Sequence, residues 1–183
     1  MIQRAALLLL LCCATGAAQA APAAAAEVDA LLQTLNKGSL GASSAAMMLE
    51  ELPTLNALGD SDRQCARSSI QSFFYAHVRQ SLISSLGQDG DAVVADWSRF
   101  LATPSGKGYL ILTGALPESA ADASIDVNNA AYTAGFEAFL GSTSFKGLND
   151  GFDAMPAPDH MAVRLSQGLQ DQCRIALKPD EIS

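Results

Sequence analysis

Tryptophan, histidine and cysteine are scarce in this chain, and acidic residues outnumber basic ones. The 183 residues include one Trp, two His and four Cys, with 11 Lys and Arg against 19 Asp and Glu. The negative balance argues against a nucleic-acid partner, because affinity for nucleic acid comes largely from the neutralisation of phosphates. It argues equally against electrostatic attachment to an anionic membrane surface.

The sequence also lacks the motifs of several enzyme classes. A phosphate-binding loop does not fit at Gly106 and Lys107, because Leu101 replaces its first Gly and Gly108 replaces its Ser or Thr. No G-x-S-x-G nucleophile motif and no H-E-x-x-H metal motif occurs. We therefore predict no cofactor.

The two histidines are too few to form a zinc site unless carboxylates complete it, so we predict no metal site. His77 falls on or beside the apolar face of a long predicted helix, and we interpret it as a structural residue rather than a catalytic one. His160 falls at a predicted helix start and is interpreted as solvated.

The first twenty residues have the features of a secretory signal peptide. Arg4 supplies the positive start, residues 5–14 are apolar with five consecutive Leu, and an A-x-A cleavage site ends at Ala20. We therefore predict export to the periplasm or the medium, with cleavage between Ala20 and Ala21. The apolar stretch is too short for a permanent anchor, so we expect no stable membrane attachment after cleavage.

Two of the four cysteines leave with this segment. A lipoprotein attached through Cys12 or Cys13 is the weaker alternative, because Leu11 stands where such a signal needs a small residue. Cys65 and Cys173 remain, and in an oxidising compartment they predict one disulfide that closes a loop of 108 residues. Such a loop contributes about 4–5 kcal/mol in the chain-entropy model. A redox-active pair is less favoured, because the C-x-x-C motif is absent.

The mature chain would have 163 residues and a net charge of −9, because Arg4 is the only charged residue removed. This length is enough for one domain with a sizeable core. We predict a flexible Ala/Pro tail at residues 21–26 and a single helical domain at residues 27–183.

Apolar residues recur at helical spacing through most of the chain, and no stretch alternates with the period of a strand. We predict an all-α fold, a compact bundle of about six or seven helices with one disulfide. The aromatic stripe at Tyr132, Phe136 and Phe139 is interpreted as core, and Met47 and Met48 as core rather than pocket residues. The predicted helices span about 24–36, 43–52, 63–86, a stretch capped by Asp89 or Asp91 that ends at 101, 104–113, a stretch from 118 or 122 to 140, and 160–178. Residues 141–158 are predicted as a loop that holds a short helical turn.

The stretch from Phe100 to Lys107 is predicted to join two helices. Pro104 drives Thr103 out of the α region and so ends the first helix. A Thr at the N-cap followed by Pro at the first helical position starts the second one.

The pattern Phe, two residues, Ser or Thr, Pro, any residue, Gly and a basic residue resembles that of the exported bacterial helical family known as domain of unknown function 2059. Phe100, Thr103, Pro104, Gly106 and Lys107 match it, although Leu101 stands where the family usually has a second aromatic residue. The similarity extends over residues 70–116, roughly a third of the mature chain. It implies a small exported all-α domain and assigns no catalytic residue.

Two hypotheses about function follow. The first is an exported, non-catalytic helical module of the cell envelope that binds an envelope protein or an apolar small molecule. The second is a hydrolase that acts on an envelope polymer through two carboxylates. The acids available for it are Glu50, Glu51, Asp89, Asp91, Asp96, Asp150 and Asp153. We favour the first, because most of these acids fall at helix starts or on solvated faces and the chain is poor in Trp and Tyr.

Overall fold

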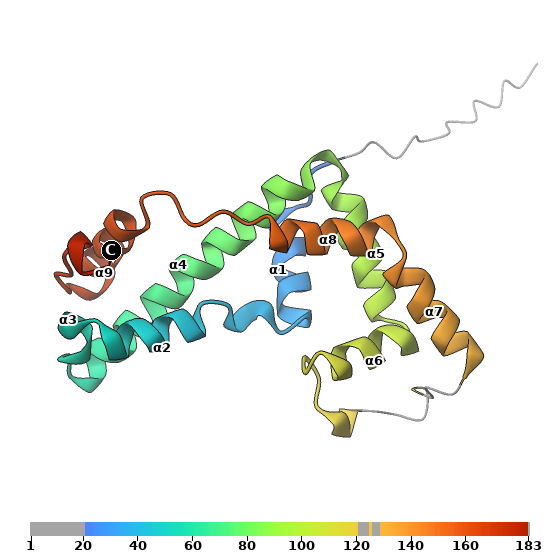
Figure 1. Cartoon of the computed structure of the whole chain (residues 1–183), viewed down its shortest axis with the longest axis horizontal. Helices are drawn as coiled ribbons and strands as arrows, with labels where there is room; N and C mark the ends of the chain where they lie inside the picture. The colour runs from blue at the N-terminus through green and yellow to red at the C-terminus, as the bar shows by residue number, and fades with distance from the viewer. Residues whose placement is uncertain (1–20, 121–124, 126–128, 183) are drawn as a thin grey trace, which may run out of the picture.

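The computed structural model of the protein describes residues 21–120, 125 and 129–182 (Figure 1). Within these residues there is no β-strand, and the predicted all-α class is confirmed. The α-helical segments are α1 (Ala25–Thr34), α2 (Ala42–Glu51), α3 (Pro53–Asn56), α4 (Asp60–Leu86), α5 (Gly90–Leu101), α6 (Pro104–Leu112), α7 (Ala130–Leu140), α8 (Thr143–Asp153) and α9 (Met161–Cys173). Short 3-10 turns occur at Lys37–Ser39, Gly87–Asp89, Glu118–Ala120 and Pro179–Glu181.

The longest helix, α4, is shared by two hydrophobic cores. Its 27 residues span about 40 Å at the usual helical rise. Ala66 and Ile70, near its start, are fully buried among residues of α2, α3 and α9. Leu82 and Leu86, near its end, are buried among residues of α1, α5, α6 and α8. Figure 1 shows these two groups of helices at opposite ends of α4, and we call them the α9 lobe and the α5 lobe.

The predicted disulfide is confirmed. Cys65 lies in the second turn of α4 and Cys173 is the last residue of α9, with their Cα atoms 5.8 Å apart. The bond therefore joins two helices of the α9 lobe across a sequence separation of 108 residues.

The structure corrects the prediction of a loop at residues 141–158. Helix α8 occupies Thr143–Asp153, and its Leu148 is 1% exposed. The helix contains two glycines, and Gly151 allows it to approach α4 closely, because a Cβ there would lie 2.7 Å from Ser85 Oγ and 3.0 Å from Leu82 Cδ1. The same glycines lower the helix propensity, and this is why the sequence indicated a loop.

Several predicted helix starts also differ from the structure. The N-cap of α4 is Gly59, so Asp60 and Asp62 lie in the first turn, where an acid interacts favourably with the helix dipole. The helix predicted at residues 160–178 occurs at Met161–Cys173, and its N-cap is His160, in the left-handed region with φ of 49°. Asp89 is the N-cap of α5, but its side chain makes no capping hydrogen bond.

The segment expected as a flexible tail has ordered contacts. Ala25 and Ala26 belong to α1, and Ala23 is 5% exposed in the core of the α5 lobe. The backbone N–H of Asp91 donates to the Ala21 carbonyl at 3.0 Å. A Cβ at Gly90 would lie 2.7 Å from the Ala23 nitrogen, so this glycine lets the segment pack against the start of α5.

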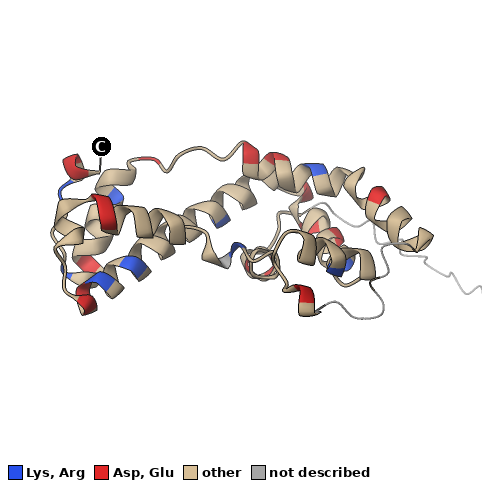
Figure 2. Ribbon diagram, turned by 60° about the horizontal axis from the view of Figure 1, so that its bottom comes forward, with Lys and Arg blue, Asp and Glu red and all other residues tan. Residues whose placement is uncertain are grey.

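Charge is distributed over both lobes. Figure 2 shows Asp and Glu residues on helices of the α9 lobe and of the α5 lobe.

The predicted signal peptide, residues 1–20, lies outside the described residues. Across the ranges that the structure describes, no helix is both long and apolar enough to span a membrane.

Candidate functional site

The predicted joint between α5 and α6 is confirmed in its local geometry. Thr103 is the N-cap of α6, and its hydroxyl accepts a hydrogen bond from the Gly106 N–H at 3.1 Å. The same hydroxyl donates to the Phe100 carbonyl at 2.6 Å. Pro104 is the first residue of α6, where its missing N–H leaves no donor unpaired. The joint therefore turns the chain sharply between two helices.

Gly106 explains why this joint needs a residue without a side chain. A Cβ at this position would overlap the Phe100 carbonyl and would lie 2.5 Å from Leu101 Cα. Because these are backbone atoms of α5, no side-chain rotation can relieve the overlap. Phe100 itself is 7% exposed and stacks on Phe139 of α7, with ring centroids 3.8 Å apart. Lys107 follows within α6 and is half-buried.

The first turns of α6 also fix the position of α7. The Ser105 hydroxyl is buried and donates to the Tyr132 carbonyl at 2.8 Å. A Cβ at Gly108 would overlap the Tyr132 hydroxyl and would lie 2.8 Å from its Cζ. The Tyr132 ring therefore lies directly over the α6 backbone, and one wall of a cavity is formed by this contact.

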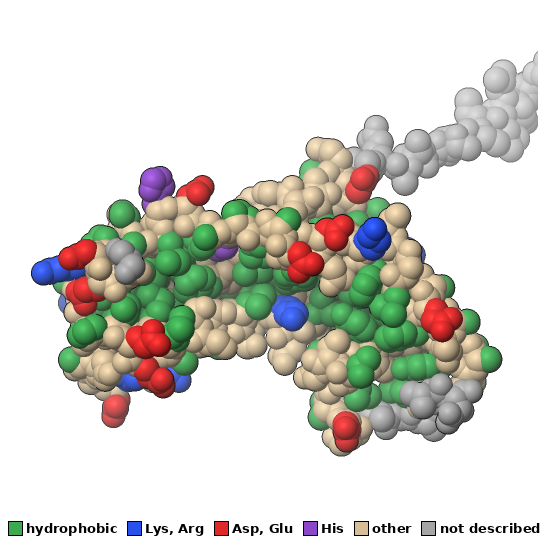
Figure 3. Space-filling view, viewed as in Figure 1, with side chains coloured by type: hydrophobic (Ala, Val, Ile, Leu, Met, Phe, Trp, Pro, Cys, Tyr) green, Lys and Arg blue, Asp and Glu red, His purple; other side chains and the backbone are tan. Residues whose placement is uncertain are grey.

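That cavity lies between α6 and α7 and has a volume of about 620 Å³. Its lining is largely apolar, and Leu112, at the end of α6, is 77% exposed. Hydrophobic side chains gather over α5, α6 and α7 on the face seen in Figure 3. The described lining consists of Gly108, Ile111, Leu112, Glu118, Ile125, Tyr132, Thr133 and Phe136. The volume is within the range of about 300–1,000 Å³ that is typical of small-molecule sites.

The sequence predicted that the aromatic residues of α7 belong to the core and not to a cavity. Phe136 and Phe139 do pack against the core of the α5 lobe, but these two side chains and that of Tyr132 are only half-buried. Phe136 and Tyr132 also face the cavity. The sequence signal for this arrangement was Gly108 in α6, where the absence of a side chain lets Tyr132 of α7 approach the α6 backbone.

The candidate carboxylates of the hydrolase hypothesis come from three parts of the fold, around α2, α5 and α8. Among the described residues, no group of three or more His, Cys, Asp or Glu side chains could hold a metal ion. Asp96 is half-buried in α5, and the others are exposed. Glu50 and Glu51 lie on α2, Asp89 and Asp91 at the start of α5, and Asp150 and Asp153 on α8.

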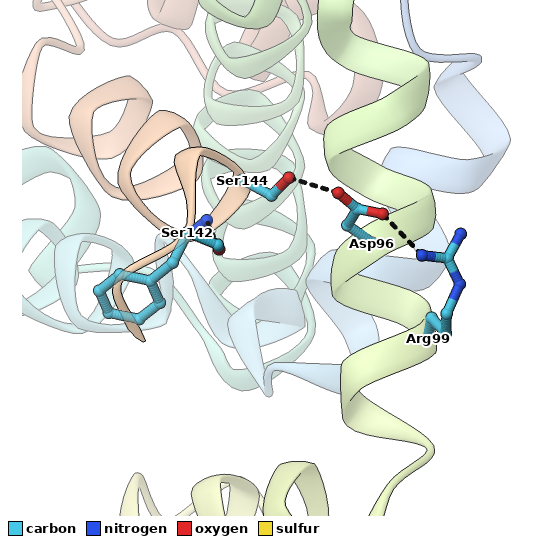
Figure 4. A network of polar contacts seen from close by, with 5 residues as sticks. Asp96, Arg99, Ser142 and Ser144 are labelled. Atoms are coloured by element: carbon cyan, nitrogen blue, oxygen red, sulfur yellow. Dashed lines mark hydrogen bonds and ion pairs between the residues drawn. The ribbon is translucent and has the colours of Figure 1, made fainter. Parts of the chain in front are cut away.

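Asp96 belongs to a polar network that connects α5 to α8 (Figure 4). One carboxylate oxygen accepts from the Ser144 hydroxyl at 2.7 Å, and the other forms an ion pair with Arg99 at 2.8 Å. The Ser144 carbonyl in turn accepts from the buried Trp97 indole N–H at 2.9 Å. Ser142 caps α8 by accepting from the Phe145 N–H at 3.0 Å. These contacts position the start of α8.

The two histidines have separate places in the fold. His77 is half-buried on α4, and its Nε2 lies 2.8 Å from the Pro156 carbonyl oxygen. This contact attaches the segment between α8 and α9 to α4, as expected of a structural histidine. His160 is exposed at the start of α9, far along the sequence from His77.

The two adjacent methionines are divided between core and surface. Met48 is 8% exposed within the α9 lobe, as predicted, whereas Met47 is 52% exposed. Neither belongs to the lining of the α6/α7 cavity.

A polar network between α1 and α4 was not predicted. Asp29 of α1 accepts from the Tyr75 hydroxyl at 2.9 Å and pairs with Arg79 at 3.0 Å. Burial raises the pKa of Tyr75, and the hydrogen bond to Asp29 and its negative charge raise it further. Gln33, Gln71 and Arg79 line a hollow of about 590 Å³ beside it. No sequence motif marks this contact, because Asp29 and Tyr75 are 46 residues apart.

The fold and this cavity define an all-α protein with an apolar space between two helices. No family model, curated protein or solved structure compared with the chain matches it. The resemblance to domain of unknown function 2059 therefore stays a prediction that rests on the residues of the α5–α6 joint.

Proposed function

We propose that this chain is an exported, non-catalytic helical protein of the cell envelope that binds an apolar small molecule between α6 and α7. The observation that carries the proposal is the cavity of about 620 Å³ lined mainly by apolar and aromatic side chains. Sites for small molecules are typically concave, mostly apolar and largely pre-formed.

The features that support export are independent of the cavity. The first twenty residues fit a signal peptide, and the structure contains the Cys65–Cys173 disulfide. Disulfides persist in the periplasm and outside the cell and are rare in the cytosol. The family resemblance agrees with export, because the family it points to is exported.

A small molecule suits the cavity better than an envelope protein does. A stable protein partner usually buries about 800 Å² on each side over a broad surface. Among the described residues, the large apolar side chains that are exposed lie on four different helices, with Leu112 on α6, Leu140 on α7, Met47 on α2 and Val163 on α9. Of these four residues, Leu112 lines the cavity between α6 and α7.

The hydrolase hypothesis has less support. Its half-buried candidate, Asp96, is engaged by Arg99 and by Ser144, and these contacts fix α8 against α5. The other candidate acids lie on the exposed faces of α2, α5 and α8.

Replacement of one cavity residue tests the proposal. We expect decan-1-ol, a neutral molecule with a ten-carbon chain, to bind residues 21–183 saturably in isothermal titration calorimetry. Leu112→Asp should weaken this binding by about tenfold or more, because burial of a Leu side chain stabilises by about 1.5–3 kcal/mol. Leu112 is 77% exposed without ligand, so its replacement should not disturb the fold.

The matched control is Val163→Asp, which replaces an exposed apolar residue of α9 that is 55% exposed. This variant should bind decan-1-ol like the parent protein. Absence of saturable binding to the parent, or equal affinities for the parent and both variants, would show that α6 and α7 do not form a ligand site.

A further inference from the structure

The α6/α7 cavity combines apolar walls with one acidic side chain at its edge. We infer that the ligand is a cationic amphiphile, with an apolar tail between α6 and α7 and an ammonium or similar cationic group at the carboxylate of Glu118. This inference rests on the proposed function and adds to it the charge and the orientation of the ligand.

Glu118 is the only charged residue in the described lining of the cavity. The other residues of that lining are neither acidic nor basic types, and Ile111, Leu112 and Phe136 are fully apolar. A site of this kind favours a molecule with a long apolar part and one positive group. The apolar contacts supply most of the affinity, while a single polar group at the edge fixes the orientation.

The Glu118 carboxylate is available for such a contact. Within residues 21–120, 125 and 129–182, no hydrogen bond or ion pair joins this carboxylate to another side chain. Asp29 and Asp96 differ in this respect, because each is paired with an arginine and accepts a hydrogen bond from a hydroxyl group. Their carboxylates connect helices, whereas Glu118 lies in an exposed 3-10 turn and is one of the residues that line the cavity.

The charge of the whole protein favours the same class of ligand. The mature chain would carry 10 basic and 19 acidic residues, since the first twenty residues contain one basic residue and no acidic one. An excess of one charge concentrates ligands of the opposite sign near the surface. A fatty acid would bring a second carboxylate close to Glu118, and a neutral alcohol would leave the carboxylate without a partner.

Tyr132 supplies a second contact for a positive group. Its hydroxyl lies over Gly108 at the α6 wall, and its ring stacks on that of Phe136 at a centroid distance of 6.4 Å. A cation near the face of an aromatic ring is attracted by the electron density of the ring. The cavity therefore offers a carboxylate and an aromatic surface, the two groups to which alkylammonium ions bind.

Three probes of equal chain length test this inference: decylamine, decan-1-ol and decanoate. Decylamine is protonated at neutral pH, as a lysine side chain is. At low ionic strength we expect residues 21–183 to bind decylamine about two- to fivefold more tightly than decan-1-ol, as for an exposed ion pair. Decanoate should bind most weakly of the three. Added salt should reduce the preference for the amine, because it screens exposed charges.

Two variants with the same change of charge locate the effect. Glu118→Gln should remove the preference for decylamine, so that the amine and the alcohol bind with affinities within about twofold of each other. Glu50→Gln makes the same replacement at an exposed position of α2 in the α9 lobe and should keep the preference. Isothermal titration calorimetry gives all of these affinities.

The possible results distinguish this inference from the proposed function. If none of the three probes binds the parent protein saturably, the proposed function itself is wrong. If all three bind equally well, or if Glu118→Gln keeps the preference for decylamine, the cavity binds apolar molecules but does not select a cation. If Glu50→Gln also removes the preference, the selection comes from net charge and not from Glu118, and the inference is again overturned.

Discussion

Asp29 connects the first described helix to the longest one through two side chains of α4. The Tyr75 hydroxyl and the Arg79 guanidinium both reach its carboxylate. Each partner is half-buried, so the contacts are partly screened by water. The network nevertheless affects how the stability of the protein depends on pH, because burial raises the pKa of Tyr75 above its usual value of 10.0.

Tyr75→Phe should destabilise the protein by about 1 kcal/mol near neutral pH, because one hydrogen bond to a charged group is lost. The folded state binds the phenolic proton more tightly than the unfolded chain does. The stabilising effect is therefore fully present below pH 10 and is lost as the pH rises through the raised pKa.

Urea unfolding of the parent and of Tyr75→Phe at several pH values tests this prediction. The difference in unfolding free energy between them should shrink above about pH 10. Burial also raises the pKa of Tyr109, but that residue is present in both proteins and cancels in the comparison. A difference that stays constant into the alkaline range would mean that Tyr75 does not donate to Asp29.

Single residues could be predicted from the sequence where their role is local. Thr103 and Pro104 act within one turn of the chain, and the structure confirms both. Cys65 and Cys173 could be paired because no other cysteine remains after the predicted signal peptide. Glu118 could not be assigned to a site, because its neighbours in the cavity come from distant residues such as Phe136.

At the level of elements, the stability of the α5–α6 joint depends on how closely the start of α6 packs against the end of α5. Gly106→Ala should cost about 2–3 kcal/mol, at the upper end of the usual range for overpacking. The added Cβ would overlap backbone atoms of Phe100 and Leu101, and α6 would have to shift to relieve the contact. The cavity beyond it should deform as well, because Gly108 and Ile111 belong to the same short helix.

Gly147→Ala is the matched control for this change. Gly147 lies inside α8, and an added Cβ would meet only Val93 Cγ2, at 3.8 Å. This replacement should be neutral or should stabilise the protein by up to about 1 kcal/mol, because Ala favours a helix over Gly. Chemical denaturation measures both variants. A Gly106→Ala protein as stable as Gly147→Ala would show that α5 and α6 do not meet as closely as the structure has them.

The elements themselves were predictable where apolar spacing and capping agree. Helix α2 was expected at residues 43–52 and occurs at Ala42–Glu51, with Ala45, Met48 and Leu49 buried. Helix α8 was missed because glycine has two opposite effects there. It lowers the intrinsic helix propensity, yet at Gly151 it permits the contact with Ser85 and Leu82 that holds the helix in place. The sequence shows that glycine lowers the helix propensity, but it does not show the packing contact that glycine permits.

At the level of the whole molecule, two cores share one helix and the disulfide belongs to only one of them. Cys65 and Cys173 lie in the α9 lobe, whereas the cavity and the aromatic cluster around Trp97 lie in the α5 lobe. Apart from the disulfide, α9 is held against α4 by its buried face and by the contact of His77 with Pro156 in the segment that precedes α9. The two lobes therefore differ in how much their stability depends on the redox state.

Reduction of the disulfide should increase amide hydrogen exchange most strongly in α9 and in the first turns of α4. The bond closes a loop of 108 residues, and its loss can cost up to about 5 kcal/mol in the chain-entropy model. Exchange in α5, α6 and α8 should change much less, because their core lies toward the other end of α4. Local opening of one lobe then requires less free energy than global unfolding.

Hydrogen exchange followed by mass spectrometry, on the oxidised and the reduced protein, resolves these regions. A protein with Cys65→Ser and Cys173→Ser should match the reduced form, and this excludes an effect of the reductant itself. Equal acceleration in both lobes would mean that α4 couples the two cores into one cooperative unit. Faster exchange confined to the α9 lobe would instead leave the α6/α7 cavity intact, so binding of decan-1-ol should survive reduction with little loss of affinity.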